Sequence, residues 1–169
     1  MDGVTVTLRA LHHGERELAH DLEAVAERHR TDHEVFHVAR DLARWSDEHG
    51  RRLAETGRHY GLDLDGPSGS PASGLVSALR EKTAEALGHR PEAGLLLLRD
   101  LRALHLAAAG NSLYWEMLAQ VAQVAQVAQA TRDARLLDLA SECHPRTLRQ
   151  MRWTNTMIKN LSPQLLSSV

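Results

Sequence analysis

Leucine, valine and alanine recur at steps of three and four residues along most of the chain, the period of an α-helix with one apolar face. The first stretch of this kind runs from about Val4 to Arg30. Its apolar stripe consists of Leu8, Leu11, Leu18, Leu22 and Val25. The period is kept only because Glu15 fills the place between Leu11 and Leu18. The pattern predicts a long amphipathic helix with one carboxylate in its buried face.

A second stretch of helical period follows Thr31-Asp32, where the short oxygen-bearing side chains suit a helix N-cap. It ends before Gly61. Its stripe consists of Val35, Val38, Leu42, Trp45, His49, Leu53 and Tyr60. A polar residue, His49, again takes an apolar position. The turn between the two stretches is short, so we expect them to form an antiparallel hairpin.

The chain between these helices and the next long helix has a different composition. Residues 61–74 are rich in Gly, Pro and Ser, which neither a helix nor a central strand tolerates, and we interpret them as a linker. Residues 75–88 have the pattern of a short helix that ends at Gly88.

The second half of the chain predicts two further long helices. The third begins at about Pro91 and continues into a Val-Ala-Gln repeat at 121–129. Its stripe consists of Leu97, Leu101, Leu104, Ala108, Asn111, Trp115 and Leu118. A period of three drifts round a helix of 3.6 residues per turn, so the repeat has no fixed apolar face. It is either a tolerated helix extension or a subunit contact.

The fourth helix is expected after Thr131-Arg132-Asp133. Its stripe consists of Leu137, Ala140, His144, Leu148, Met151, Thr154, Ile158, Leu161 and Leu165. Pro145 lacks a backbone N–H and should kink or split this helix near His144. The four long helices together predict an all-α fold, a four-helix bundle made of two antiparallel hairpins in a single domain, 1–169.

Length and charge limit the classes of function. With 169 residues the chain can build one hydrophobic core without a disulfide or a structural metal. Twenty Lys and Arg against 22 Asp and Glu give no strong field, which argues against nucleic acid and membrane partners. The N-terminus lacks the features of a signal peptide, and the lone Cys143 suits a reducing compartment. We therefore expect a cytoplasmic protein.

Two polar residues in the core stripes face each other in the predicted hairpin. Facing pairs in an antiparallel hairpin have residue numbers with a nearly constant sum, and Leu22 with Leu42 fits the same sum as Glu15 with His49. The carboxylate and the imidazole should therefore meet at one level inside the bundle. An unpaired buried carboxylate costs several kcal/mol or becomes neutral, so a partner is physically required.

This pair has two explanations. It can be a hydrogen bond that fixes the register of the helices, or it can supply ligands for one divalent ion of iron, manganese or zinc. His12, one turn before Glu15, is the candidate third ligand, and Ser46 lies one turn before His49. If the connection at 61–91 crosses the length of the bundle, Asn111 arrives near Glu15; if it does not, His105 arrives instead. Asn111 lies on the core stripe, which favours the crossover.

Two helical hairpins joined by a long glycine-rich connection, with Glu15 facing His49 at mid-bundle, resemble the ferritin-like family of four-helix bundles. The resemblance is architectural and covers the whole chain. It implies a centre built from a Glu on each of two helices and a Glu-x-x-His motif on each of the others. Glu15 matches the first-helix Glu and His49 matches the His of the second-helix motif. Ser46 stands where that motif has Glu, and the fourth helix has no Glu-x-x-His.

The sequence therefore predicts a ferritin-like bundle with a degenerate polar centre that binds one divalent metal ion and is not a ferroxidase. The alternative is a metal-free structural or protein-interaction bundle. No phosphate-binding glycine loop, nucleophile elbow or pair of carboxylates at one level indicates an enzyme. Cys143 and His144 are adjacent on a helix, so their side chains point about 100° apart and form no nucleophile–base pair. A homodimer is the expected assembly.

Overall fold

The computed structural model describes residues 2–66, 92–127 and 134–167. In these ranges the chain forms four α-helices and no β-strand: α1 (Gly3–Arg28), α2 (His33–Arg58), α4 (Ala93–Val127) and α5 (Ala134–Leu166). The all-α prediction is confirmed. The linker residues 67–74, the short helix at 75–88 and the end of the 121–129 repeat lie outside the described residues. None of the described helices combines the length and the apolarity needed to cross a membrane.

The first hairpin begins and ends at residues with defined backbone roles. Asp2 caps α1 by accepting a hydrogen bond from the backbone N–H of Thr5 at 2.9 Å. Asp32 caps α2 in the same way through the N–H of Val35 at 3.1 Å, as the sequence predicted. Beyond α2, Gly61 adopts a positive φ of 73°, which a glycine reaches without steric cost. This turn sends the chain back towards α1.

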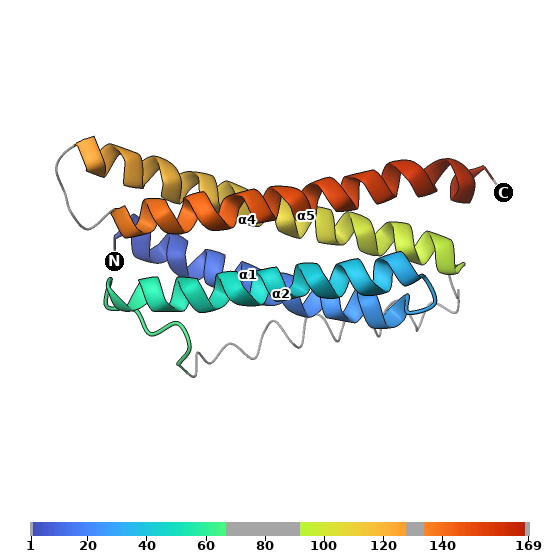
Figure 1. Ribbon diagram of the computed structural model, residues 1–169, viewed down its shortest axis with the longest axis horizontal. Coiled ribbons are helices and arrows are strands. Elements are labelled where there is room, and N and C mark those ends of the chain that lie inside the picture. The colour runs from blue at the N-terminus through green and yellow to red at the C-terminus, as the bar shows by residue number, and fades with distance from the viewer. Residues whose placement is uncertain (1, 67–91, 128–133, 168–169) are drawn as a thin grey trace.

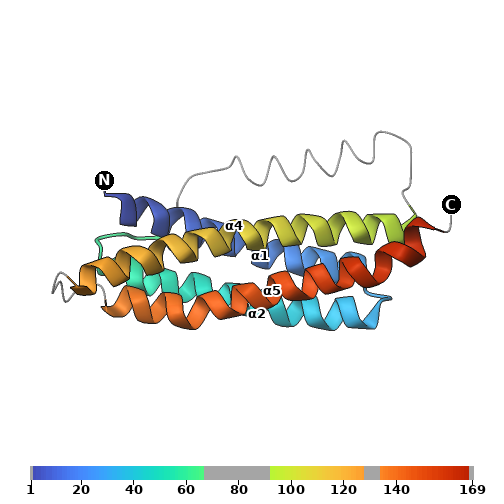
Figure 2. The ribbon, with the colours of Figure 1, turned by 90° about the horizontal axis from the view of Figure 1, so that it is seen from above.

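The four helices lie along one long direction, with the α1–α2 hairpin against the α4–α5 hairpin (Figures 1 and 2). Helix α4 packs on α1, and α5 packs on α2. Asp100 near the start of α4 contacts Arg28 at the end of α1, whereas Trp115 further along α4 contacts Glu15. These contacts make α4 antiparallel to α1 and hence parallel to α2. This is the direction that a crossover connection requires.

Two apolar clusters fill the bundle, one towards each end. The first consists of Leu18, Leu22, Val25, Ala26, Val35, Ala39, Leu42, Ala43, Leu97, Leu101, Leu104, Ala108 and Met157. The second consists of Leu8, Leu11, Leu53, Trp115, Leu118, Ala122, Leu136, Leu139, Ala140 and Cys143. The residues between these sets along each helix form the middle layer of the bundle.

The predicted buried face of α5 is correct only in part: Ala140 and Thr154 are buried as expected. Leu148, expected in the stripe, is 46% exposed, and His144 is only partly buried. The buried residues of α5 are Leu136, Leu139, Ala140, Cys143, Thr147, Gln150, Thr154 and Met157. The predicted stripe follows the apolar side chains of the helix. In the structure, α5 instead buries the polar side chains of Thr147 and Gln150. Of the two expectations for Pro145, a kink or a split, the split is wrong, because α5 is continuous through it.

Candidate functional site

A layer of buried polar side chains crosses the bundle between the two apolar clusters. Helices α2 and α5 each supply two of them at a spacing of three residues, so that both members of a pair lie on the same face. The layer consists of Glu15 from α1, Ser46 and His49 from α2, Asn111 from α4, and Thr147 and Gln150 from α5. A layer of this composition inside an otherwise apolar bundle is the strongest candidate for a functional site.

Glu15 and His49 lie at the centre of this layer, and both side chains are completely buried. Nδ1 of His49 is 3.3 Å from Oε1 of Glu15, which confirms the predicted level of the pair. The same oxygen accepts a hydrogen bond of 2.9 Å from Nε1 of Trp115. The indole also meets the imidazole ring edge to face, with ring centroids 5.7 Å apart. One carboxylate oxygen therefore has two nitrogen neighbours.

Several polar atoms of the layer have no hydrogen-bond partner among the described residues. The contact between Glu15 and His49 is close, but its angles do not form a hydrogen bond, so both ring nitrogens of His49 are without one. The other unpartnered atoms of the layer are Oε2 of Glu15, Nδ2 of Asn111, Oγ1 of Thr147 and Oε1 of Gln150. Buried polar atoms normally have partners, because leaving one unpaired costs about 1–3 kcal/mol.

Contacts between α2 and α5 place the remaining members of the layer. Nε2 of Gln150 donates to Oγ of Ser46 at 2.9 Å and to the carbonyl oxygen of Leu42 at 3.1 Å. Two turns further along α2, Arg52 donates to Sγ of Cys143 at 3.7 Å. The two helices are antiparallel, so these contacts put Thr147 at the level of His49.

Asn111 reaches the layer from α4, as the crossover predicted. Its amide packs against Gly14, where a Cβ atom would lie 2.2 Å from Oδ1 of Asn111. Gly14 thus allows the asparagine side chain to lie directly on the backbone of α1. His105, the alternative for a connection that does not cross, bonds Thr154 of α5 at 2.9 Å instead.

His12 does not join Glu15 and His49 through any described contact. Its Nε2 lies 3.7 Å from Oδ1 of Asp65, in the loop after α2. Desolvation by burial, together with the nearby charge of Arg16, lowers the pKa of His12. His12 lines an open groove of about 440 Å³ between α1, α2 and this loop, with Arg16, His20, Asp47 and Asp65 among the other lining residues. Its role as a metal ligand stays a prediction.

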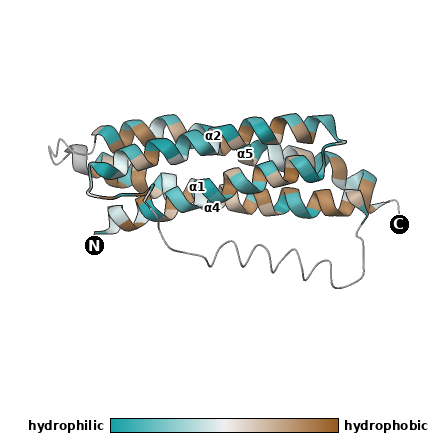
Figure 3. Cartoon of the chain, turned by 90° about the horizontal axis from the view of Figure 1, so that it is seen from below, coloured by the Kyte–Doolittle hydropathy of each residue, from teal (hydrophilic) through white to brown (hydrophobic). Residues whose placement is uncertain are grey.

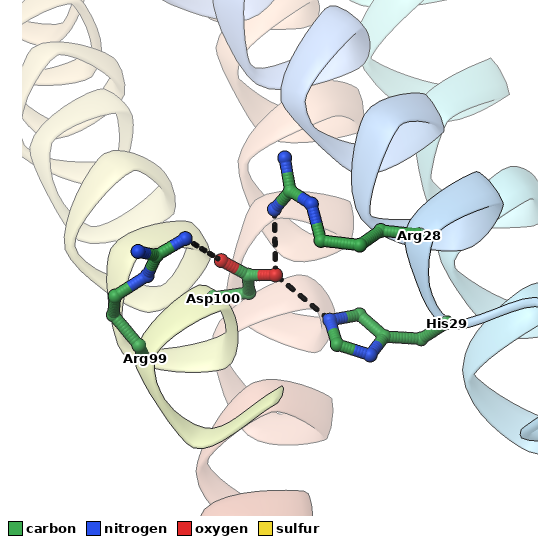
Figure 4. A network of polar contacts seen from close by, with 4 residues as sticks. All are labelled: Arg28, His29, Arg99 and Asp100. Atoms are coloured by element: carbon green, nitrogen blue, oxygen red, sulfur yellow. Dashed lines mark hydrogen bonds and ion pairs between the residues drawn. The ribbon is translucent and has the colours of Figure 1, made fainter. Parts of the chain in front are cut away.

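A second buried polar cluster lies at the end of the bundle where α1 meets α4 (Figure 4). Oδ2 of Asp100 accepts hydrogen bonds from Arg28 at 2.7 Å and from Nε2 of His29 at 2.8 Å, and Oδ1 contacts Arg99 at 3.2 Å. Burial alone would raise the pKa of Asp100, but the hydrogen bonds from His29 and Arg28 outweigh it and lower that pKa. Every oxygen here has a partner, so this cluster is a tie between helices.

His144 belongs to a third polar group, on the outside of the α4–α5 pair. Its Nε2 is 2.8 Å from Oγ of Ser112, and its Nδ1 is 3.8 Å from Oε2 of Glu116. The order of hydroxyl, imidazole and carboxylate matches a hydrolytic triad. Ser112, however, lies within α4, where the backbone N–H groups are used by the helix and none is free to stabilise an oxyanion. We assign no catalysis to it.

Cys143 is buried in the second apolar cluster beside this layer. Desolvation by burial raises the pKa of its thiol to about 12. At pH 8 the native thiolate population should be about 1,000-fold below that of the unfolded chain, so reaction with iodoacetamide should be slow until the protein unfolds. Mass spectrometry of samples alkylated with and without urea measures this. Equal rates in both samples would contradict the burial of the thiol.

Thr147 and Gln150 were not predicted from the sequence as members of the layer. A signal was present, because Thr147 and Gln150 repeat the three-residue spacing of Ser46 and His49. Among the described residues, no group of three or more His, Cys, Asp or Glu side chains is arranged to hold a metal ion. Any ion in this layer would therefore need hydroxyl or amide oxygens as well.

A comparison of the chain with family models, curated proteins and solved structures finds no match.

Proposed function

We propose that the protein binds one divalent metal ion in its buried polar layer, through Glu15 and His49. The observation that carries the proposal is the set of unpartnered buried atoms in this layer. Oε2 of Glu15, a ring nitrogen of His49, Oγ1 of Thr147 and Oε1 of Gln150 all offer electron pairs. A cation is the kind of occupant that would satisfy several such atoms together.

The spacing of the two principal ligands supports the same proposal. Ligands bonded to one tetrahedral ion at about 2.0–2.1 Å lie about 3.3 Å from each other. Nδ1 of His49 and Oε1 of Glu15 are 3.3 Å apart, without the angles of a hydrogen bond. This distance fits two ligands of one ion as well as it fits an ion pair. Trp115 would keep the carboxylate in place from the other side.

The donor set narrows the choice of metal. One carboxylate, one imidazole and neutral oxygens suit iron(II), manganese(II) or zinc(II). We propose binding and not ferroxidase activity, because Ser46, Asn111, Thr147 and Gln150 supply no carboxylate that could bridge two ions. The resemblance to ferritin-like bundles is part of this proposal. It is supported by the helix directions and by the paired three-residue spacings on α2 and α5.

A second candidate function has an observation of its own. Trp115 donates a hydrogen bond to Glu15 and packs edge to face against His49, so the indole satisfies part of this pair without an ion. A metal-free layer of this kind would fix the register of the helices in a structural or protein-interaction bundle. The two candidates differ in whether an ion stabilises the fold. The cytoplasmic location stays a prediction under either of them.

Titration of chelator-treated protein with iron(II), manganese(II) and zinc(II), followed by calorimetry, tests the proposal. We expect about one equivalent to bind, and saturation at 100 times the dissociation constant should add about 2.7 kcal/mol to the free energy of unfolding. Glu15→Gln and His49→Gln should each abolish this gain. His37→Gln, at an exposed histidine of α2, is the matched control and should retain it.

The double variant Glu15→Leu/His49→Leu separates the two candidate functions. Replacing a buried polar pair by apolar residues of similar size is often neutral for stability. Wild-type protein that binds no ion, together with a double variant of unchanged stability, would overturn the metal proposal. Binding of two equivalents of iron would show that neutral residues had replaced the bridging carboxylates without loss of the second site.

A further inference from the structure

Helix α4 is apolar on its outer face as well as on its inner face. Its inner face contributes Leu101, Leu104, Trp115 and Leu118 to the core. The exposed large apolar residues of α4 are Leu95, Leu106, Leu113, Met117, Val121 and Val124. Hydrophobic positions accordingly colour much of α4 in Figure 3. A helix that is apolar all round is normally covered on all sides.

From Leu106 onwards these exposed residues form one continuous stripe, whereas the exposed Arg99 and Arg102 separate Leu95 from it. From Leu106 the stripe passes through Gly110, Leu113 and Met117 to Val124, at steps that keep it on one side of a helix. From Leu106 to Val124 it extends roughly 27 Å, at 1.5 Å per residue. Monomeric proteins rarely expose a contiguous apolar patch of this extent, and such patches mark interaction sites.

We propose that this stripe is the interface with a second copy of the chain, in which the two α4 helices pack antiparallel about a two-fold axis near Gly110. This inference does not depend on the metal proposal. A two-fold interface must be complementary to itself. With the axis between Ala109 and Gly110, Leu106 of one copy lies opposite Leu113 of the other. The same symmetry places Leu95 opposite Val124.

The charges beside the stripe agree with this pairing. Arg102 is exposed and forms no ion pair with another described residue, whereas Glu116 lies 3.8 Å from His144 and accepts a hydrogen bond from Gln120 in its own chain. Arg102 and Glu116 lie on the same edge of the stripe, and the two-fold axis brings the arginine of one copy next to the glutamate of the other. The stem of Arg102 would cover Met117. Two such opposite-charge pairs favour the antiparallel arrangement over a parallel one, in which like residues would meet.

Gly110 provides the close approach that this axis requires. A Cβ atom added there would meet nothing within 4 Å. The glycine is therefore not needed for packing inside the bundle, and its outer side is open. A residue without a side chain at the crossing point lets two helix backbones come close together.

Sedimentation equilibrium in the presence of EDTA tests the interface separately from the metal site. We expect the wild type to be a dimer and Leu113→Glu to raise its dissociation constant by about 100-fold or more, because each centre residue occurs twice in the dimer. Leu113 is 63% exposed, so the variant should fold. Leu166→Glu, at a 59% exposed leucine at the end of α5, is the matched control and should remain a dimer. A monomeric wild type, or a dimer that survives Leu113→Glu, would overturn the proposal.

A cross-link locates the axis. Under oxidation with copper phenanthroline, the double variant Leu106→Cys/Leu113→Cys should form a disulfide-linked dimer, because the axis places residue 106 of one copy opposite residue 113 of the other. Glu55→Cys, exposed on α2 at the diagonal of the bundle from α4, should stay monomeric on a non-reducing gel. Buried Cys143 is present in both variants and serves as an internal control. Equal cross-linking of Glu55→Cys and of the double variant would place the interface elsewhere.

Discussion

Trp115→Ala should lower the free energy of unfolding by about 3–5 kcal/mol, the usual cost of removing a buried tryptophan. Trp115 is fully buried and contacts both the apolar cluster and the polar layer. Its loss would leave a cavity and would also remove the N–H that donates to Oε1 of Glu15. Both effects destabilise the polar layer, because the cavity would open beside the carboxylate of Glu15. Urea unfolding followed by circular dichroism measures the change.

Trp115→Phe separates the two contributions. Phenylalanine keeps much of the apolar contact but has no N–H, so we expect a smaller loss of about 1–3 kcal/mol from the unpaired carboxylate oxygen. If Glu15→Gln is added, the cost of Trp115→Phe should decrease, since the group left unpaired is then neutral. A loss below about 1 kcal/mol for Trp115→Ala would mean that the indole is not part of the core.

Asp100→Asn should destabilise the protein by about 3 kcal/mol at pH 7, because removal of the charge breaks a buried hydrogen-bonded ion pair. The variant leaves Arg28 and His29 without their carboxylate at the junction of α1 and α4. Asp41→Asn, at an exposed carboxylate that contacts Arg44 within α2, is the comparison and should change stability little.

The same carboxylate should make stability depend on acidity. The pKa of Asp100 is lowered in the folded protein below its ordinary value of 3.8. A lowered carboxyl pKa gives stabilisation that is present above the unfolded pKa and is lost as the pH falls through the folded pKa. The wild type should therefore lose its advantage over Asp100→Asn below about pH 4. Urea midpoints of both proteins between pH 2 and 7 would show this, and a constant difference would contradict it.

The sequence predicted the first hairpin better than the second. Glu15 and His49 could be matched because both interrupt clear apolar stripes and the short turn fixes the register of their helices. On α5 the polar members of the layer do not interrupt an apolar stripe, because Thr147 and Gln150 are buried while Leu148 is exposed. A pattern based on hydropathy follows the leucine. The inward rotation of α5 becomes understandable only when Ser46 is known to face Gln150 across the bundle.

The sequence predicted the height of a side chain along the bundle better than it predicted the residues that this side chain contacts. Three residues along a helix correspond to a rotation of about 300°, so His12 is displaced sideways from Glu15 although it is one turn away. This displacement is enough for Asp65 to become its neighbour. The bond between Trp115 and Glu15 depends on how α1 and α4 are rotated against each other, which neither sequence stripe specifies. Trp115 was expected only as a member of the apolar stripe of its helix.

The separation of these contacts along the chain implies an order of assembly. Glu15 and His49 belong to one hairpin with a short turn, whereas Trp115 is 100 residues from Glu15, and Gln150 is 108 residues from Leu42. Local contacts form at a lower entropic cost than distant ones. The carboxylate and the imidazole can thus meet while water still reaches them. Only the arrival of the second hairpin dehydrates them, so the polar centre forms first and is enclosed last.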